Sequence, residues 1–222
     1  MTSNKSPSER FAEAKLKSKT SEVDEFASSL KFPLDDFQDK ACRAIARDSG
    51  VLVAAPTGAG KTIVGEFAIY LAVKRNQKVF YTTPIKALSN QKYQELVNRY
   101  GENMVGILTG DNNTNSSAPI VVMTTEVLRN MIYANSLNLM NLGYVIMDEV
   151  HYLADRFRGA VWEEVILHLP KDVKIVSLSA TVSNAEEFGA WLDEVRGSTD
   201  IIVSEKRPVP LNQHVQIGRA HV

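Results

Sequence analysis

Several features that would narrow the class of this protein are scarce in the chain. Among 222 residues there is one cysteine, Cys42, so an internal disulfide is excluded. A lone thiol fits a reducing compartment, and the cytoplasm is the default location. The longest uninterrupted apolar run, Phe67–Val73, is far shorter than the roughly 18 residues that indicate a membrane span. We therefore expect no membrane partner.

The chain also lacks an excess of positive or negative charge. Lys and Arg together number 25 and Asp and Glu 26, which gives a formal net charge of -1 and a pI of about 6.4. Because there is no global basic field, any contact with nucleic acid has to be local. The N-terminus has no apolar segment, and its basic residues alternate with acidic ones, unlike a signal or transit peptide. No export signal is expected.

The composition and hydrophobic pattern of the sequence divide the chain into an N-terminal arm and a core domain. Residues 1–31 are rich in Ser, Lys and Glu, and we expect a flexible arm with some helix. Over residues 32–205, short apolar runs alternate with helical periods, which predicts an α/β domain with a doubly wound, mostly parallel sheet and helices on both faces. The expected strands are Val51–Ala54, Val79–Thr82, Val105–Leu108, Ile120–Met123, Tyr144–Met147, Ile175–Leu178 and Ile201–Val203. The expected helices are Asp36–Arg47, Lys61–Lys74, Lys86–Tyr100, Glu126–Tyr133, Ala160–His168 and Ala185–Val195.

The first expected strand leads directly into a Gly-rich loop that opens a helix, which is the context of a phosphate-binding P-loop. Glycines there allow successive backbone N–H groups to point at phosphate oxygens. Lys61 would neutralise the β- and γ-phosphates, and the Thr62 hydroxyl would bind Mg²⁺. The general pattern opens with Gly where this chain has Ala55, and an ordinary strand-to-helix turn is the alternative. The expected nucleotide-binding residues of the loop are Pro56, Thr57, Gly58, Ala59, Gly60, Lys61 and Thr62.

A second acidic motif follows the strand Tyr144–Met147. The strand ends in Asp148-Glu149-Val150-His151. Asp148 would hold Mg²⁺ through its water shell, and Glu149 would orient and polarise the attacking water. His151 could link hydrolysis to a partner domain. The alternatives are a solvated strand end and an ordinary surface histidine, but the P-loop upstream favours the catalytic interpretation of the two carboxylates.

These motifs resemble those of a known family. The box Asp148–His151 and Ser179-Ala180-Thr181 after the next strand are similar to motifs of DEVH-box superfamily 2 helicases. Three longer stretches, Phe32–Gln38, Thr83–Lys92 and Asp155–Gly159, resemble the superkiller-type branch, and in particular actinobacterial HelY-type proteins. The resemblance covers residues 32 to about 215. It implies the first RecA-like P-loop NTPase domain of an ATP-dependent, 3′-to-5′ RNA helicase.

The resemblance also implies roles for single residues. Phe32 would stack near the adenine and Gln38 would read its edge, which implies a preference for ATP; the alternative is a core aromatic and a helix-surface amide. Ser179, Ala180 and Thr181 would couple the ATP site to strand separation, although a Ser or Thr there can also cap the next helix.

Three polar loops are the candidate nucleic-acid site. Each follows an apolar strand, so they should gather at the carboxyl edge of the sheet, where open α/β sheets bind ligands. In helicases of the family such loops contact the RNA backbone, whereas simple turns and caps are the alternative. Residues 112–117, which follow the second loop, are expected to form a mobile surface loop, to which we assign no function. The candidate residues are Pro84, Lys86, Asn90 and Gln91, then Thr109, Gly110 and Asp111, and then Thr124, Thr125, Glu126 and Arg129.

The resemblance further implies that part of the motor is missing from this chain. No Arg-rich motif of a second RecA-like domain follows Thr181, and that domain would supply the arginine fingers for rapid hydrolysis. Residues 206–215 would begin the linker to it. The back-translation of residues 216–222 can match a sequencing-adapter read-through, so we hypothesise that this tail is not native.

Two other functions stay open. A DNA-repair helicase would grip the backbone of single-stranded DNA in the same way, because backbone contacts do not identify the sugar. A switch or adaptor would bind ATP without unwinding. Glu149 argues against the switch, since a pure binding module does not need a carboxylate that orients water.

Overall fold

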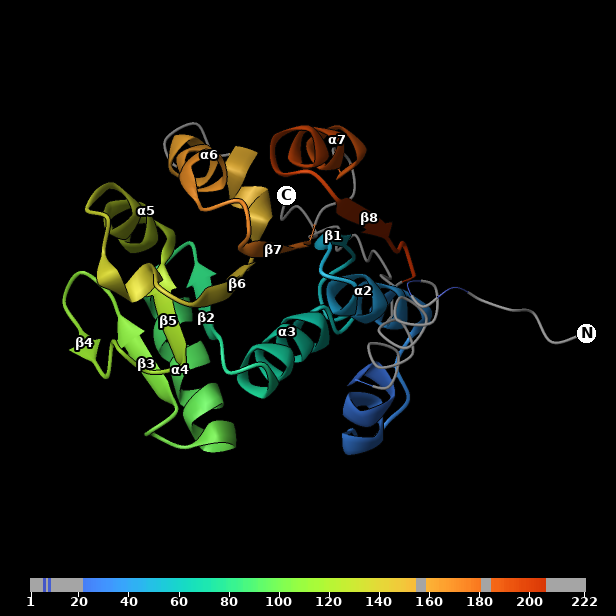
Figure 1. Ribbon diagram of the computed structural model, residues 1–222, viewed down its shortest axis with the longest axis horizontal. Coiled ribbons are helices and arrows are strands. Elements are labelled where there is room, and N and C mark those ends of the chain that lie inside the picture. Colours follow the sequence, from blue (N-terminus) through green and yellow to red (C-terminus); the bar gives the residue numbers. More distant parts are fainter. Residues whose placement is uncertain (1–5, 7, 9–21, 155–158, 181–184, 207–222) are drawn as a thin grey trace, which may run out of the picture.

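An eight-stranded sheet between two layers of helices forms the core of the computed structural model, which describes residues 6, 8, 22–154, 159–180 and 185–206 (Figure 1). The strand order is β4-β3-β5-β2-β6-β7-β1-β8, and all pairs are parallel except β3 with β4. The strands are β1 Gly50–Ala54, β2 Lys78–Thr83, β3 Val105–Leu108, β4 Asn113–Thr114, β5 Ile120–Thr124, β6 Leu142–Met147, β7 Lys174–Ser179 and β8 Thr199–Val203. The helices are α2 Asp36–Ala46, α3 Thr62–Lys74, α4 Lys86–Tyr100, α5 Thr125–Tyr133, α6 Gly159–His168 and α7 Ala185–Arg196, with short 3-10 helices η1 Leu137–Leu139 and η2 Val150–Ala154.

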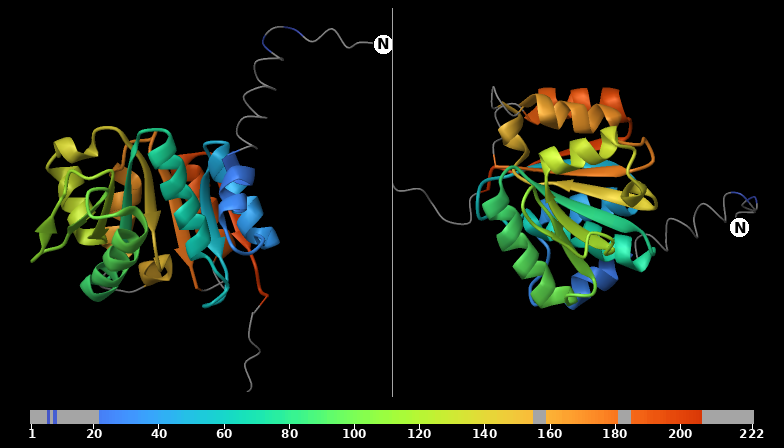
Figure 2. Two further views of the ribbon diagram at one scale, coloured as in Figure 1. Left: turned by 90° about the horizontal axis from the view of Figure 1, so that it is seen from below. Right: turned by 90° about the vertical axis from the view of Figure 1, so that its left-hand side faces the viewer.

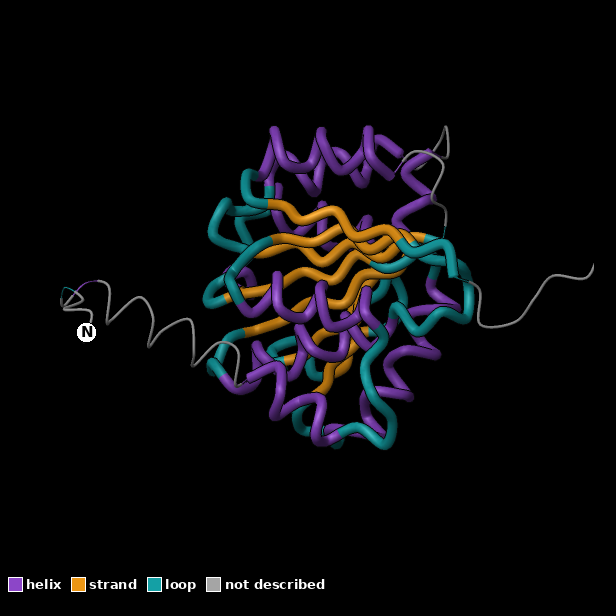
Figure 3. Tube along the Cα trace, turned by 90° about the vertical axis from the view of Figure 1, so that its right-hand side faces the viewer, coloured by secondary structure: helices purple, strands orange, loops and turns teal. Residues whose placement is uncertain are grey.

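Alternate residues of each strand face the two helix layers. In β1, Val51 and Val53 belong to the core cluster beneath α2, α3 and α4, whereas Leu52 and Ala54 belong to the cluster beneath α5, α6 and α7. Two further views show the sheet enclosed between these layers (Figures 2 and 3). A strand that is buried on both faces needs apolar residues at every position. This is why the strands were visible in the sequence as continuous apolar runs.

The predicted fold class is confirmed, and the seven expected strands and six expected helices are all present with bounds that differ by two residues or fewer. The eighth strand, β4, was not predicted. It lies in the stretch expected to be a mobile loop, where it pairs antiparallel with Ile107 and Leu108 of β3. Its two residues are polar and exposed, so no apolar pattern marked them. Gly106 permits the close approach, because a Cβ there would lie 2.0 Å from the Asn115 carbonyl oxygen.

The predicted boundary of the N-terminal arm at residue 32 is too late. Residues 22–29 form a helix, and Val23 and Phe26 are each only 1% exposed within the core cluster of α2 and α3. The Phe26 ring meets the Phe67 ring edge-on, with 5.2 Å between the centroids. The sequence held the signal, since Val23, Phe26 and Leu30 are spaced to share one helical face, but the surrounding Ser, Lys and Glu obscured it.

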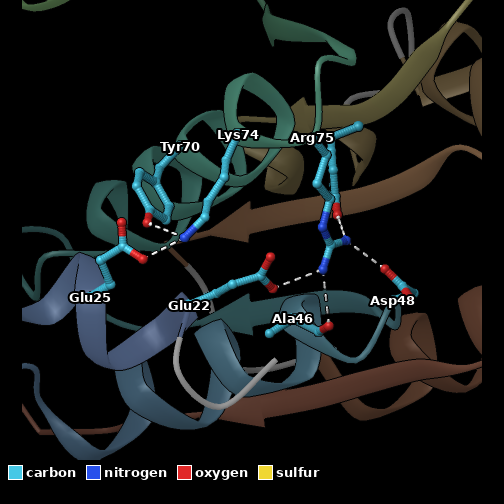
Figure 4. A network of polar contacts seen from close by, with 8 residues as sticks. Glu22, Glu25, Ala46, Asp48, Tyr70, Lys74 and Arg75 are labelled. Carbon is cyan, nitrogen blue, oxygen red and sulfur yellow. Dashed lines mark hydrogen bonds and ion pairs between the residues drawn. The ribbon is translucent and has the colours of Figure 1, made fainter. Parts of the chain in front are cut away.

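Ion pairs also hold this N-terminal helix against the end of α3 (Figure 4). The Arg75 guanidinium lies 3.0 Å from the Glu22 carboxylate and 2.7 Å from that of Asp48, and Lys74 pairs with Glu25. Arg75 also donates to the Tyr144 hydroxyl at 2.7 Å. The first ordered helix is therefore part of the domain. Within the described ranges, no helix is long and apolar enough to cross a membrane.

Replacing Phe26 with Ala should lower the free energy of unfolding by about 3–5 kcal/mol, because it empties a filled site in the core. Urea denaturation of the chain would measure the loss. Phe32→Ala is the matched control, since Phe32 is 50% exposed and its removal should cost less than about 1 kcal/mol. Equal small losses for both variants would show that the helix over residues 22–29 is not packed on the core.

Candidate ATP and nucleic-acid site

The motifs gather at the carboxyl edge of the sheet in two adjacent groups. The P-loop follows β1, Asp148–His151 follows β6 and Ser179-Ala180 ends β7, and these three strands are neighbours. The three predicted nucleic-acid loops follow β3, β5 and β2, which are also neighbours. The two groups meet where β2 pairs with β6. Parallel pairing thus brings all these loops to one edge, and the strand order separates the expected nucleotide residues from the expected nucleic-acid residues.

The P-loop has the backbone that a phosphate site requires. Gly58 and Gly60 adopt φ of 83° and 85°, a region that favours glycine, and Ala55 N–H donates to the Ser179 carbonyl at 3.1 Å. The Lys61 ammonium donates to the carbonyl oxygens of Ala55 at 2.8 Å and Pro56 at 3.1 Å. Its pKa is lowered by burial, while the negative charges of Glu149 and Asp148 oppose that shift. Lys61 therefore lies within the electrostatic reach of both carboxylates.

Gln38 contacts the P-loop rather than facing solvent. It is 3% exposed; its side-chain oxygen accepts from Asp35 N–H at 2.9 Å, and its amide nitrogen donates to the Gly60 carbonyl at 3.0 Å. Both ends of the amide are used by the protein, so in this conformation Gln38 supports the loop and does not present its amide to a base. Phe32, the other expected adenine contact, is 50% exposed.

A cavity of about 710 Å³ adjoins the P-loop at Ala59. Its walls come from the segment that begins α2 and from the end of β8. A volume of this size is within the range of pockets that bind small ligands. Charged side chains of both signs line it, including Asp36, Lys40 and Lys206.

Asp148 is fixed by contacts to both of its oxygens. The Tyr81 hydroxyl donates to Oδ2 at 2.6 Å, and the Glu149 backbone N–H donates to Oδ1 at 2.9 Å. Asp148 N–H in turn donates to the Thr82 carbonyl at 3.0 Å. Burial and the Asp148 charge raise the pKa of Tyr81 well above its usual value, so this phenol remains a donor.

Glu149 and His151 form a close pair beside Asp148. The Glu149 carboxylate oxygen Oε2 lies 3.2 Å from His151 Nδ1, and neither of these buried atoms makes a hydrogen bond within the described part of the chain. Burial, and next the Asp148 charge, raise the pKa of Glu149. Glu149 also has φ of 55°, a left-handed conformation that is uncommon for a residue with a side chain and is frequent at functional sites. A carboxylate held this way is suited to accepting a proton.

The donor set fits Mg²⁺. Asp148 offers a carboxylate, and Thr62 offers an exposed hydroxyl at the start of α3, both of which are the hard oxygen ligands that this ion prefers. Mg²⁺ in nucleotide sites is held by one or two such protein groups together with phosphate oxygens and water. In the described part of the chain, no group of three or more His, Cys, Asp or Glu side chains could hold a metal. The arrangement fits an ion that is completed by a bound nucleotide.

The three predicted nucleic-acid loops lie side by side, but their residues differ in exposure. The Lys86 ammonium lies 3.1 Å from the Asp111 carboxylate, which joins the loops after β2 and β3, and Thr109 donates to Asp111 at 2.9 Å. The exposed members are Lys86, Asn90, Gln91, Gly110 and Asp111, and the half-buried ones are Glu126 and Arg129. Pro84, Thr109, Thr124 and Thr125 are buried. Side-chain contact with a ligand is therefore open mainly to the exposed set.

Some predicted features lie outside the described residues: Thr181 of the coupling motif, residues 155–158 of the superkiller-type stretch, the linker from residue 207 and the tail over residues 216–222. One residue of the site was missed in the sequence. Tyr81 lies within a buried strand and has the pattern of a core aromatic, so nothing marked its hydroxyl as a partner of Asp148.

The parallel sheet, the P-loop after β1 and the acidic motif after β6 define a RecA-like P-loop NTPase domain. The chain belongs to the DEAD/DEAH box helicase family, which matches residues 35–188. It therefore carries a DEAD/DEAH box helicase domain.

Curated relatives agree with this assignment. The chain is 65% identical over 198 residues to the probable helicase HelY of Mycobacterium tuberculosis, an alignment that covers 89% of this chain and 22% of the relative. It is 45% identical over 196 residues to the chloroplastic DExH-box ATP-dependent RNA helicase DExH15 of Arabidopsis thaliana, covering 86% of this chain and 17% of the relative. The chain therefore spans about a fifth of the length of these proteins.

Solved structures share the fold. The helicase Lhr of Mycobacterium smegmatis bound to single-stranded DNA and AMP-PNP superposes with a TM-score of 0.66 at 27% identity, covering 82% of this chain and 27% of that chain. A hypothetical ATP-dependent RNA helicase from Sulfolobus tokodaii gives a TM-score of 0.63 at 22% identity, covering 83% and 57%.

The P-loop geometry makes a prediction about two glycines with the same φ. Gly60 and Gly101 both have φ of 85°, but a Cβ at Gly60 would lie 2.6 Å from the Gln38 amide nitrogen, whereas one at Gly101 would meet nothing within 4 Å. Gly60→Ala and Gly101→Ala should each cost about 1–2 kcal/mol of unfolding free energy. Only Gly60→Ala should also weaken ATP binding, by at least about tenfold. Calorimetric titration with ATP would test this, and equal affinities for the two variants would contradict it.

Proposed function

We propose that this chain is the first motor domain of an ATP-dependent RNA helicase that unwinds RNA in the 3′-to-5′ direction together with a second RecA-like domain. One observation carries the proposal: the P-loop after β1 and the carboxylates of Asp148 and Glu149 after β6 lie at the same edge of the sheet, separated only by β7. The RNA assignment is supported by the relative DExH15, named an RNA helicase, at 45% identity. The direction of movement rests on the resemblance to superkiller-type helicases.

In this proposal the P-loop binds the triphosphate of ATP. Backbone N–H groups of the loop would donate to phosphate oxygens, and the Lys61 ammonium would exchange its two carbonyl partners for phosphate oxygens. The base lies near Phe32 and the cavity beside Ala59. Gln38 would have to leave Gly60 to read the adenine edge, so its first role is to hold the loop.

Hydrolysis needs a water in line with the γ-phosphate. Glu149 orients and polarises this water, and the same burial that raises its pKa makes it a stronger base. His151 lies 3.2 Å from Glu149 and can receive or return the proton. It would also link hydrolysis to a facing domain. Bound Mg²⁺ would supply charge neutralisation at the phosphates, held by Thr62 and by Asp148 through water. Ser179 and Ala180, next to the P-loop backbone, would couple this site to strand separation.

The rate of ATP hydrolysis would stay low without the second RecA-like domain. An arginine finger contributes about 10³ to 10⁵ in rate, and we assign that group to the missing domain. The linker to it would begin at residue 206. We place the working protein in the cytoplasm, in keeping with a lone buried thiol at Cys42.

Nucleic acid would cross the ends of β3, β5 and β2 as a single strand. Lys86, Asn90 and Gln91 at the start of α4 would contact phosphates, and Gly110, Asp111, Glu126 and Arg129 would border the path. The buried Thr109, Thr124, Thr125 and Pro84 would shape the loops and offer backbone groups. A DNA substrate is the competing possibility, since the structure of the helicase Lhr, at 27% identity, contains single-stranded DNA.

Lys61→Ala should weaken Mg²⁺-ATP binding by at least about tenfold, because it removes a charged donor to the phosphates. Glu149→Gln should keep the affinity and lower turnover by about 10²-fold or more. Titration with a fluorescent ATP analogue and a phosphate-release assay on the full-length protein measure the two quantities. A Glu149→Gln protein that keeps full biological activity although its turnover is lost would favour the ATP switch over the helicase, and one that retains full turnover would show that Glu149 does not polarise the water.

Lys86→Ala should weaken binding of single-stranded RNA regardless of sequence and reduce the slope of log affinity against log salt by about 1. Lys174→Ala is the matched control, because Lys174 begins β7 at the opposite edge of the sheet. Fluorescence anisotropy with RNA and DNA of one sequence provides the measurement. Tighter binding of RNA than DNA is expected; the reverse order would favour the DNA helicase, and equal losses for both variants would remove the proposed path.

A further inference from the structure

Tyr81 connects the two groups of loops at the carboxyl edge. It lies on β2, which ends in a predicted nucleic-acid loop, and its hydroxyl donates to Asp148 at the end of β6 at 2.6 Å. The residue is 1% exposed. A buried hydroxyl is costly unless it is hydrogen-bonded, and a phenylalanine would fill the same space without that cost. The hydrogen bond to Asp148 therefore offsets the cost of burying this hydroxyl.

The ring of Tyr81 is held from two sides. On the α3 side, Gly65 faces the ring, and a Cβ there would lie 3.6 Å from Tyr81 Cε2, an ordinary van der Waals contact. On the α4 side, the Lys92 ammonium lies 5.4 Å from the ring centroid and pairs with Glu95. With the ring packed between these helices, the hydroxyl lies beside Asp148 and donates to it.

The contact determines how Asp148 presents its oxygens. With Oδ2 bound to Tyr81 and Oδ1 bound to Glu149 N–H, rotation of the carboxylate would break at least one hydrogen bond. Each oxygen keeps a further lone pair for water. A carboxylate that is oriented before the ion arrives loses less freedom when it binds the water shell of that ion.

We propose that Tyr81 is a positioning residue of the Mg²⁺ site: its hydroxyl holds the Asp148 carboxylate in the orientation that accepts the hydrated ion. This inference rests on the proposed Mg²⁺-ATP site. It adds a role for a strand residue outside the P-loop and the DEVH box.

The test is the Mg²⁺ dependence of nucleotide affinity in Tyr81→Phe. A fluorescent, non-hydrolysable ATP analogue is titrated into the chain in EDTA and at a series of Mg²⁺ concentrations, so the readout is binding and not turnover. We expect Tyr81→Phe to raise the Mg²⁺ concentration for half-maximal tightening by about tenfold, the loss of one hydrogen bond to a charged group. The affinity in EDTA should not change, which also shows that the variant is folded.

Tyr144→Phe is the matched control. It removes another buried phenol hydroxyl, bonded to Arg75 at 2.7 Å near the opposite end of the sheet, and should lower stability without moving the Mg²⁺ dependence. In Asp148→Asn, which lacks the charge that Tyr81 orients, adding Tyr81→Phe should cause no further shift.

Three results would overturn the inference: an unshifted Mg²⁺ dependence in Tyr81→Phe, an equal shift in Tyr144→Phe, or an additive shift in the double variant. A wild-type chain that binds the analogue equally well in EDTA and Mg²⁺ would overturn the Mg²⁺-ATP site itself. That failure is distinct, because it appears before any variant is made.

Discussion

Parallel pairing is the constraint on which the site depends. Every strand except β4 runs in one direction. The carboxyl ends of these seven strands therefore share one edge of the sheet, although they are far apart in the sequence. Parallel strands require crossover connections; the helices α3, α4, α5, α6 and α7 return the chain between strands and, together with α2, cover the two faces. The burial of both faces fixes the register, because a shift by one residue would exchange the two cores. The positions of the loops follow from that register.

Strand order then decides which loops meet. The P-loop, the DEVH box and Ser179-Ala180 follow three neighbouring strands, and the three predicted nucleic-acid loops follow another three. The groups adjoin only where β2 and β6 pair, and at that seam Tyr81 and the Thr82 carbonyl both bond Asp148. A change in the nucleotide around Asp148 would therefore act first on the contacts of Asp148 with β2. This gives the proposed coupling a physical starting point within one domain.

Much of this could be predicted from the sequence, because the signals were strong and local. Continuous apolar runs predicted the strands, and the Gly60-Lys61 turn and the Asp148-Glu149 pair correctly marked loops at the ends of β1 and β6. What was missed depends on tertiary contacts. The helix over residues 22–29 is polar on most of its surface, and β4 is a backbone pairing of exposed residues. The contacts of Gln38 with Gly60 and of Tyr81 with Asp148 join residues far apart in the sequence, which no local pattern records.

The most direct test is a crystal structure of the chain with a non-hydrolysable ATP analogue, Mg²⁺ and a short single-stranded RNA. The account predicts the triphosphate in the P-loop, with Lys61 Nζ moved from the Ala55 carbonyl to a phosphate oxygen and the ion facing Asp148. It also predicts the RNA backbone across the ends of β3, β5 and β2. A nucleotide bound away from the P-loop, or RNA on another face of the sheet, would contradict it.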